Sequence, residues 1–182
     1  HLDQDAARLD RLVRRLLDLA RADVMPATPT ARAEVAAVIA RLAARYQAAE
    51  FKVVMAEPAI SASVAMPEDV LESILSNLLD NARQHGGDAV IVTVACPTPR
   101  PESPATLIIE VSDNGPGIST ANAARVFEPF FTTARAQGGT GLGLAVVKSL
   151  VNAHRGAIEL VDSAAGTRLR ISLPLATADR SP

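Results

Sequence analysis

The segment that most limits the possible folds is residues 138–144, which read Gly-Gly-Thr-Gly-Leu-Gly-Leu and lead into an apolar, helix-forming stretch. Successive glycines leave backbone N–H groups free to point at an anion, and the start of a helix adds a positive partial charge. No Lys-Ser or Lys-Thr pair follows at the spacing of a P-loop, and Val146 takes the third glycine position of a dinucleotide-binding fingerprint. The segment therefore predicts phosphate binding by another architecture, with a flexible linker as the alternative.

Composition and charge exclude several classes of protein. The 182 residues carry 18 Lys and Arg against 20 Asp and Glu, a net charge of -2, so the chain lacks the strongly basic field of a nucleic-acid binder. A single cysteine, Cys96, excludes a disulfide framework and a cysteine-rich metal site. No apolar run approaches the roughly 20 residues of a transmembrane helix. We expect one cytoplasmic domain with an appended helix, without membrane contact.

The first 24 residues predict an amphipathic helix that needs a packing partner. Leu2, Leu9 and Leu16, with further leucines between them, take the heptad positions of a bundle helix among Arg and Asp residues. One helix cannot bury this stripe alone, so it packs either on the rest of the chain or in an intermolecular bundle. Residues 25–30 (Met-Pro-Ala-Thr-Pro-Thr) break the helix and predict a hinge. Because the chain begins inside a helical pattern, we expect it to be a piece of a longer protein.

Residues 31–176 alternate irregularly between helical and strand patterns, and residues 177–182 are expected to be a tail. The predicted fold class is α+β: a two-layer α/β sandwich with one mixed sheet and helices on one face. The first two strands are expected to pair with each other as a hairpin. Apolar spacing predicts helices over residues 35–46, from Pro67 onward, near 122–127 and over 142–153, and strands over residues 51–55, 60–64, 90–96, 107–112, 157–161 and 168–173.

A polar ridge is predicted on the third helix. Asn77 and Asn81 are four residues apart, and Gln84 or His85 continues the same face. Two carboxamides and an imidazole are costly to bury without partners, so this face is either solvated or directed at a ligand. In the second case the amide oxygens supply hard ligands to Mg²⁺ and contact its phosphates.

A turn with two glycines, residues 113–118, directly follows the apolar strand over residues 107–112. Gly115 and Gly117 allow a tight turn and a close approach of the backbone to a flat ligand. Asp113 can accept a hydrogen bond from an exocyclic amine. A turn of this kind is equally compatible with a purely structural role.

Five short motifs, in this order, resemble the N, G1, F, G2 and G3 boxes of sensor histidine kinases. Each motif alone is modest, but their order over residues 67–174 is specific. Residues 9–21 also resemble the second helix of that family's dimerisation and phosphotransfer bundle. The five motifs are residues 77–82 (Asn-Leu-Leu-Asp-Asn-Ala), 113–117 (Asp-Asn-Gly-Pro-Gly), 127–131 (Phe-Glu-Pro-Phe-Phe), 139–144 (Gly-Thr-Gly-Leu-Gly-Leu) and 166–167 (Gly-Thr).

This resemblance implies a Bergerat-type (GHKL) ATP-binding domain over residues 31–176, after a partial bundle helix (1–24) and a hinge linker (25–30). It implies that Asp113 contacts the adenine amine, that Asn81, with Asn77, binds Mg²⁺, and that the glycines of the fourth motif flank the phosphates. The residues that the resemblance assigns to ATP binding are Asn77, Asn81, Gln84, His85, Asp113, Gly115, Gly117, Ile118, Phe131, Gly139, Thr140, Gly141, Leu142, Gly143, Leu144 and Thr167.

The resemblance further implies a lid over residues 127–140, with Phe130 and Phe131 docking it onto the phosphotransfer bundle. This lid is short, so less of the nucleotide is expected to be covered. Gln84 stands where the family often has Lys or Arg, and Arg83 or Arg135 is the expected replacement for that phosphate contact.

Asn77 separates this chain from other members of the superfamily that it resembles. Type II topoisomerases, mismatch-repair ATPases, heat-shock chaperones and anti-sigma kinases place a Glu four residues before the Mg²⁺-binding Asn, as a general base. An amide cannot take a proton at neutral pH. Water and serine need deprotonation before they attack phosphorus, whereas a neutral imidazole is already nucleophilic. The residue therefore favours histidine as the phosphoryl acceptor.

None of the three histidines has the acidic residue and proline that should follow the acceptor. His1 belongs to the partial bundle helix, His85 either lines the nucleotide site or caps its helix, and His154 is expected to be structural. We therefore expect a catalytic fragment that binds Mg²⁺ and ATP or ADP, and phosphorylates a histidine on another segment for relay to a response regulator. Its full-length parent is expected to be a homodimer, and the sequence leaves open whether that parent is anchored in the bacterial inner membrane. A nucleotide-gated interaction module and a GHKL-type ATPase switch stay open as alternatives.

Overall fold

The computed structural model describes residues 31–46, 51–55, 59–85, 89–95, 105–134 and 139–176. The predicted bundle helix (1–24), hinge (25–30) and tail (177–182) lie outside these residues. The same holds for His1, Cys96 and Arg135. The domain boundaries drawn from the sequence therefore stay predictions.

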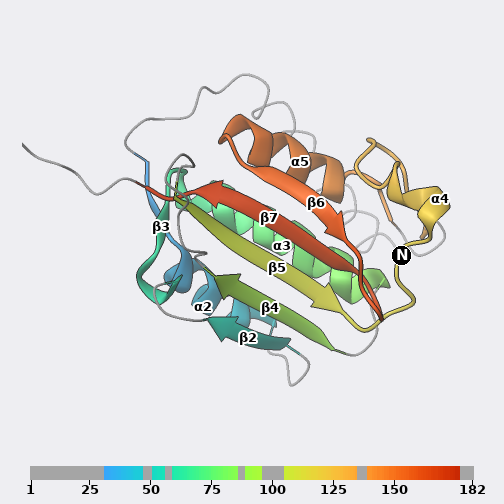
Figure 1. Cartoon of the computed structure of the whole chain (residues 1–182), viewed down its shortest axis with the longest axis horizontal. Coiled ribbons are helices and arrows are strands. Elements are labelled where there is room, and N and C mark those ends of the chain that lie inside the picture. Colours follow the sequence, from blue (N-terminus) through green and yellow to red (C-terminus); the bar gives the residue numbers. More distant parts are fainter. Residues whose placement is uncertain are drawn as a thin grey trace, which may run out of the picture.

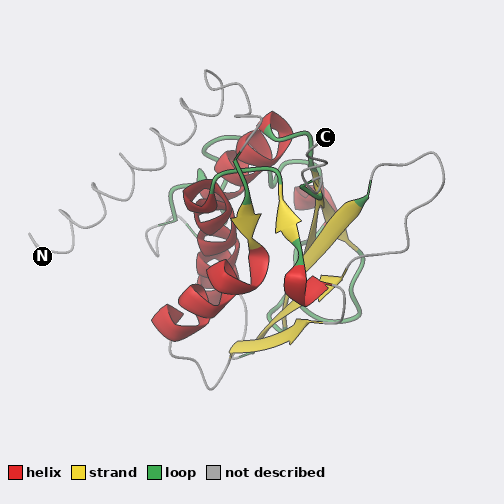
Figure 2. Cartoon of the chain, turned by 90° about the vertical axis from the view of Figure 1, so that its left-hand side faces the viewer, coloured by secondary structure: helices red, strands yellow, loops and turns green. Residues whose placement is uncertain are grey.

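A five-stranded sheet and three helices form two layers, which Figure 2 shows edge-on. Strand β2 runs parallel to β4, and every other neighbouring pair in the sheet is antiparallel. The mixed sheet with helices on one face, predicted from the sequence, is confirmed (Figure 1). In spatial order the strands are β2 (Phe51–Met55), β4 (Val90–Ala95), β5 (Thr106–Asp113), β7 (Arg168–Pro174) and β6 (Ala157–Val161).

The three covering helices are α2 (Val35–Tyr46), α3 (Glu68–His85) and α5 (Gly143–Ala153), which lie behind the sheet in Figure 1. Strand β5 shows why the layers meet: Leu107, Ile109 and Val111 are buried, and the residues between them face the other way. Burying such an apolar side chain stabilises the fold by about 1.5–3 kcal/mol. Leu71, Ile74 and Leu78 complete the core from α3, where helical spacing places them on one face.

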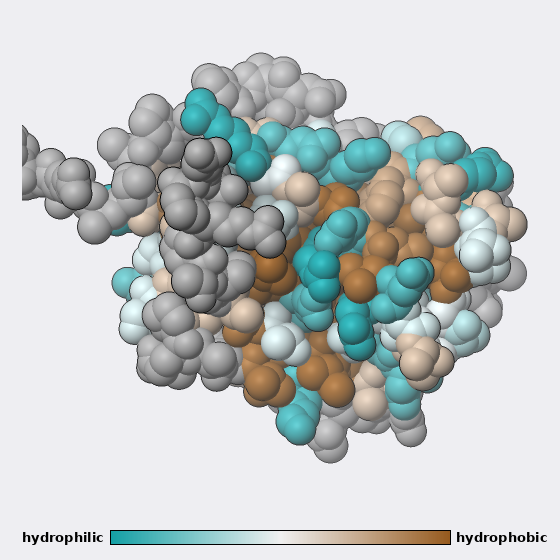
Figure 3. All heavy atoms as spheres, in the orientation of Figure 1, coloured by the Kyte–Doolittle hydropathy of each residue, from teal (hydrophilic) through white to brown (hydrophobic). Residues whose placement is uncertain are grey.

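No helix of the described residues covers the other face of the sheet, which carries both charged and apolar side chains (Figure 3). Arg170 pairs across the strands with Glu110, at 2.6 Å, and with Glu159, at 3.0 Å. Val54 and Ile91 are exposed on the neighbouring strands. Three ionised groups in the middle of this face keep it compatible with water.

The predicted hairpin between residues 51–55 and 60–64 is wrong. β2 pairs with β4, and α3 provides the crossover that a parallel pair requires. The second segment instead forms a short 3₁₀ turn, Ala59–Ser61, and the two-residue strand β3 (Ser63–Val64). β3 pairs with β1 (Ala33–Glu34) in a separate two-stranded sheet. Val53 of β2 packs against the main core. The pairing of β2 with β4 therefore depends on burial in the folded domain, which the residues next to β2 in the sequence do not specify.

The helix predicted near residues 122–127 is shorter and earlier, because α4 covers only Thr120–Ala123. Turns replace the rest: the backbone N–H of Arg125 donates to the carbonyl of Asn122, and that of Glu128 donates to the carbonyl of Arg125. These i to i+3 bonds tighten the backbone, and Phe130 then adopts a positive φ of 66° that a helix cannot contain.

Candidate functional site

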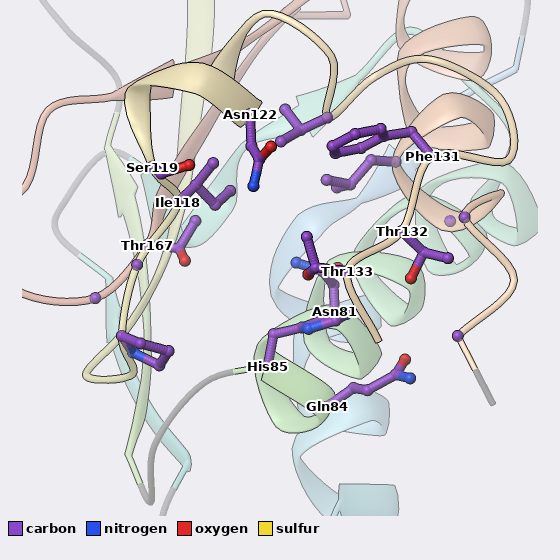
Figure 4. Close-up of a pocket in the computed structure, with 18 of the residues that line it drawn as sticks. Asn81, Gln84, His85, Ile118, Ser119, Asn122, Phe131, Thr132, Thr133 and Thr167 are labelled. Atoms are coloured by element: carbon purple, nitrogen blue, oxygen red, sulfur yellow. The ribbon is translucent and has the colours of Figure 1, made fainter. Parts of the chain in front are cut away.

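A cavity of about 540 Å³ lies between the C-terminal half of α3, the start of α5 and the loops that flank α4 and precede β7. Figure 4 shows Asn81, Gln84 and His85 entering it from α3, with Asn122 and Phe131 opposite. All but three of the predicted ATP-binding residues line the cavity, and the three are Asp113, Gly115 and Leu142. The lining residues are Asn77, Asn81, Gln84, His85, Pro116, Gly117, Ile118, Ser119, Asn122, Val126, Phe131, Thr132, Thr133, Gly139, Thr140, Gly141, Gly143, Leu144, Ser163, Ala164, Ala165, Gly166 and Thr167.

Asp113 is not one of the lining residues but is bonded to two loops at the edge of the cavity, with 8% of its surface exposed. Its carboxylate oxygen Oδ1 accepts hydrogen bonds from the backbone N–H groups of Gly115 and Thr167, both at 3.0 Å. The backbone N–H of Asp113 donates in turn to the carbonyl of Thr167 at 2.9 Å. Asp113 thus joins the loop after β5 to the loop before β7. Leu142 is a core residue with no exposed surface.

Two glycines let these loops approach each other closely. Gly117 has φ 76°, and a Cβ on it would lie 2.9 Å from the carbonyl oxygen of Gly166. Gly166 has φ 67°, and a Cβ on it would collide with the carbonyl group of Asp113. Any other residue at either position would be strained and would also push the loops apart.

Asn77 occupies the deepest position on the α3 face of the cavity, with 6% of its surface exposed. Its Nδ2 group donates to the carbonyl of Ser73 at 2.9 Å, whereas its buried Oδ1 atom has no hydrogen-bond partner in the structure. An unpaired buried acceptor costs about 1–3 kcal/mol, so this oxygen is a ready ligand for a cation or a donor. Asn77 is therefore not on a solvated face, and Asn81 lines the same cavity one helical turn later.

The segment around Phe130 and the glycine-rich loop hold each other in place. The backbone N–H of Phe130 donates to the carbonyl of Gly141 at 2.9 Å, and a Cβ on Gly141 would lie 2.7 Å from the backbone nitrogen of Phe131. Helix α5 begins two residues after Gly141, so its N-terminal N–H groups lie at the cavity wall. An anion bound there accepts hydrogen bonds from these N–H groups and is also attracted by the positive end of the helix dipole.

Among the described residues that line the cavity there is no Lys, Arg, Asp or Glu. The one titratable group is His85. Burial lowers the pKa of its imidazole from 6.5, while the carboxylate of Asp113 acts weakly in the opposite direction. His85 is therefore neutral at neutral pH, and the described wall carries no side-chain charge.

Arg83, one of the two expected replacements for a phosphate-binding cation, does not line the cavity. Its Nη2 atom lies 3.6 Å from Oδ1 of Asp80, and its guanidinium lies over the ring of Tyr46, 5.7 Å from the ring centre. The helical period explains this, because residue 83 is turned about 100° from residue 84. Arg135, the other candidate, is outside the described residues.

Several polar residues at the cavity were missed by the sequence interpretation. Ser119, Asn122, Thr132 and Thr133 project toward it in Figure 4, and Ser163 to Ala165 line it from the loop before β7. The only available signal was their position next to the recognised motifs. His154, by contrast, is away from the cavity, and its Nδ1 atom lies 2.9 Å from the carbonyl oxygen of Leu150.

Comparison with known proteins agrees with this fold and site. The family model of histidine kinase-, DNA gyrase B-, and HSP90-like ATPases matches residues 66–177. The chain therefore belongs to this ATPase family, in the branch formed by the catalytic domains of sensor histidine kinases.

Two relatives illustrate the similarity in sequence. The probable sensor histidine kinase TcrY of Mycobacterium tuberculosis is 41% identical over 118 residues, 62% of this chain and 24% of TcrY. The sensor histidine kinase CpxA of Escherichia coli K12 is 38% identical over 112 residues, 59% of this chain and 23% of CpxA. The chain thus spans about a quarter of the length of these relatives.

Two solved structures illustrate the similarity in fold. The structure of full-length ShkA in complex with AMPPNP superposes with a TM-score of 0.72 at 25% identity, covering 96% of this chain and 37% of that one. The mycobacterial sensor histidine kinase MprB superposes with a TM-score of 0.62 at 32% identity, covering 78% of this chain and 93% of that one. In the part of the chain that the structure describes, no helix has both the length and the apolar character to cross a membrane.

Proposed function

We propose that the chain is the catalytic part of a sensor histidine kinase: it binds Mg²⁺ and ATP in the cavity and transfers the γ-phosphoryl group to a histidine on another polypeptide segment. The observation that carries the proposal is Asn77, a buried amide with an unpaired oxygen at the wall of the nucleotide-sized cavity. An amide cannot deprotonate water or a hydroxyl, whereas an imidazole nucleophile needs no such base.

The residues present fit a magnesium–phosphate group. The unpaired Oδ1 of Asn77 and the side chain of Asn81 supply the oxygen ligands that Mg²⁺ prefers. Within the described ranges no three His, Cys, Asp or Glu side chains gather as an alternative metal site. When bound, Mg²⁺ neutralises the charge that builds up on the transferring phosphoryl group.

The chain's own residues orient the nucleotide. The N–H groups at the start of α5 donate to phosphate oxygens, and the neighbouring hydroxyl of Thr140 lines the same wall. At the other end, two backbone N–H groups fix the orientation of the Asp113 carboxylate through Oδ1, and its second oxygen is left to accept from the adenine amine. Holding the reactants in line in this way supplies most of the rate enhancement that phosphoryl transfer needs.

The partners follow from the same proposal. Residues 31–176 form the catalytic domain, and residues 1–24 and 25–30 form part of the phosphotransfer bundle and its hinge. The acceptor histidine is supplied by the first helix of that bundle in a homodimeric parent, which then phosphorylates a response regulator aspartate. The similarity to sensor histidine kinases over the catalytic region supports these assignments.

A phosphotransfer assay tests the proposal. The chain is incubated with γ-labelled ATP, with and without a matched bundle that carries the acceptor histidine. We expect acid-labile label on the bundle, no label on the chain alone, and neither binding nor label with Asn81→Ala. Stable labelling of His85 in the chain would contradict the proposal.

A nucleotide-gated interaction module is the second candidate, and the short lid favours it. The backbone N–H of Gly139 donates to the carbonyl of Ala134 at 3.0 Å, so the described residues on either side of positions 135–138 lie close together. In the same assay, bound ATP with an unlabelled bundle would identify the module. Rapid ATP hydrolysis that Asn81→Ala abolishes would identify an ATPase switch.

A further inference from the structure

The described cavity wall has no charged side chain to compensate a polyphosphate. Its polar groups are carboxamides, hydroxyls, backbone N–H groups and the imidazole of His85. A nucleoside triphosphate places several negative charges next to this wall, and each phosphate added from AMP to ADP to ATP contributes about one further negative charge. Removing such charges from water without a compensating partner is costly. The affinity of the site therefore depends on what supplies the missing positive charge.

Gln84 is the α3 residue that reaches the phosphate end of the cavity. A Cβ on Gly139 would lie 3.2 Å from Nε2 of Gln84 and 2.6 Å from Oγ1 of Thr132, so both side chains converge on the glycine-rich loop. In Figure 4, Gln84 and Thr132 lie on the opposite side of the cavity from Ile118 and Thr167. No hydrogen bond joins the Gln84 amide to another described residue, so among these residues nothing occupies its two N–H donors.

We propose that Gln84 is a specificity-determining residue, whose neutral carboxamide donates to the nucleotide phosphates and leaves charge compensation to Mg²⁺ and to the N–H groups of α5. The inference rests on the proposed nucleotide binding and deepens it. Without Mg²⁺, each added phosphate brings charge that no side chain of the described wall neutralises, so the chain binds ADP more tightly than ATP. Mg²⁺ held by the amide oxygens of Asn77 and Asn81 would compensate this charge, so in its presence the order of affinities reverses.

Binding measurements test the inference without any phosphotransfer. Isothermal titration calorimetry gives Kd for ATP and ADP, in Mg²⁺ and in EDTA, for the wild type, Gln84→Lys and Gln84→Met. We expect EDTA to weaken ATP binding by the wild type at least about tenfold more than ADP binding, and Gln84→Lys to recover at least about tenfold of the loss. Gln84→Met keeps the size but removes the donors, so ATP binding in Mg²⁺ weakens several-fold.

A matched control separates a local contact from a change of net charge. Asn152 is exposed near the far end of α5, so Asn152→Lys adds the same charge away from the cavity and is expected to recover nothing in EDTA. Equal ATP affinity of the wild type in Mg²⁺ and EDTA, or equal recovery by both lysine variants, would refute the inference alone. A folded wild type that binds neither nucleotide in Mg²⁺ would refute the proposed function as well, and circular dichroism of every variant establishes that it is folded.

Discussion

The backbone N–H of Thr167 donates to Oδ1 of Asp113 at 3.0 Å, although the two residues are 54 positions apart in the sequence. The reverse bond, from the Asp113 N–H to the Thr167 carbonyl, measures 2.9 Å. The carboxylate that we propose to accept a hydrogen bond from the adenine amine therefore also links the loop after β5 to the loop before β7. Its two roles predict separable effects.

We expect Asp113→Ala to lower the free energy of unfolding by about 2 kcal/mol, since two backbone N–H groups lose a charged acceptor in a buried position. Asp113→Asn keeps an oxygen for these donors, so its effect on stability is expected to be about half as large. Both variants should lose ATP affinity by at least about tenfold. Asp113→Ala removes the acceptor for the adenine amine, and Asp113→Asn turns an N–H donor toward that amine when its oxygen accepts from the backbone. Urea unfolding and calorimetry measure the two quantities, and unchanged ATP binding by Asp113→Asn would disprove the adenine contact.

Gly166→Ala is expected to destabilise the chain by at least about 2 kcal/mol, from the cost of a positive φ combined with a steric collision. The collision is with Asp113, because the added Cβ would overlap its carbonyl group. Thermal unfolding followed by circular dichroism measures the loss. Ala164→Ser, an exposed change in the same loop, serves as the control and should stay within about 0.5 kcal/mol of the wild type.

His85 is expected to make stability depend on pH. Its pKa is lower in the folded chain than the unfolded value of 6.5, because burial disfavours the imidazolium. The unfolded state therefore binds the proton more readily, so this contribution is complete above pH 6.5 and declines as pH falls through the folded pKa. His85→Gln should show a smaller loss of unfolding free energy than the wild type between about pH 7.5 and about pH 5. An identical pH dependence of the two proteins would contradict this assignment.

Tyr46 connects α2 to α3, because its hydroxyl donates to Oδ1 of Asp80 at 2.9 Å and lies 3.3 Å from the carbonyl oxygen of Ser76. Burial and the neighbouring carboxylate raise the pKa of this phenol, so it stays protonated and donating through the alkaline range. Tyr46→Phe is expected to cost about 1–2 kcal/mol of stability. ATP affinity should change less than about twofold, since neither Tyr46 nor Asp80 lines the cavity. A large loss of binding would instead show that this network positions Asn77 and Asn81.

The parts of the fold that were predictable from the sequence are those with strong local periodicity. The alternation in residues 107–112 identified β5 to within a residue at each end, and the helical spacing after Pro67 identified α3. The partner of β2 was not predictable, because parallel pairing joins residues that are far apart and α3 lies between them. Residues 60–64 had a strand-like alternation, but only Ser63 and Val64 form a strand, and this strand pairs with β1 outside the main sheet.

The site divides in a similar way. The sequence by itself determined the chemical groups: the amides of Asn77 and Asn81, a glycine-rich loop before a helix, and an amide where other members of the superfamily have a general base. Only the tertiary structure decided that Gln84 faces the cavity while Arg83 turns to Tyr46 and Asp80. The helical period puts residues on one face, but which face meets a cavity depends on contacts between segments that are distant in the chain.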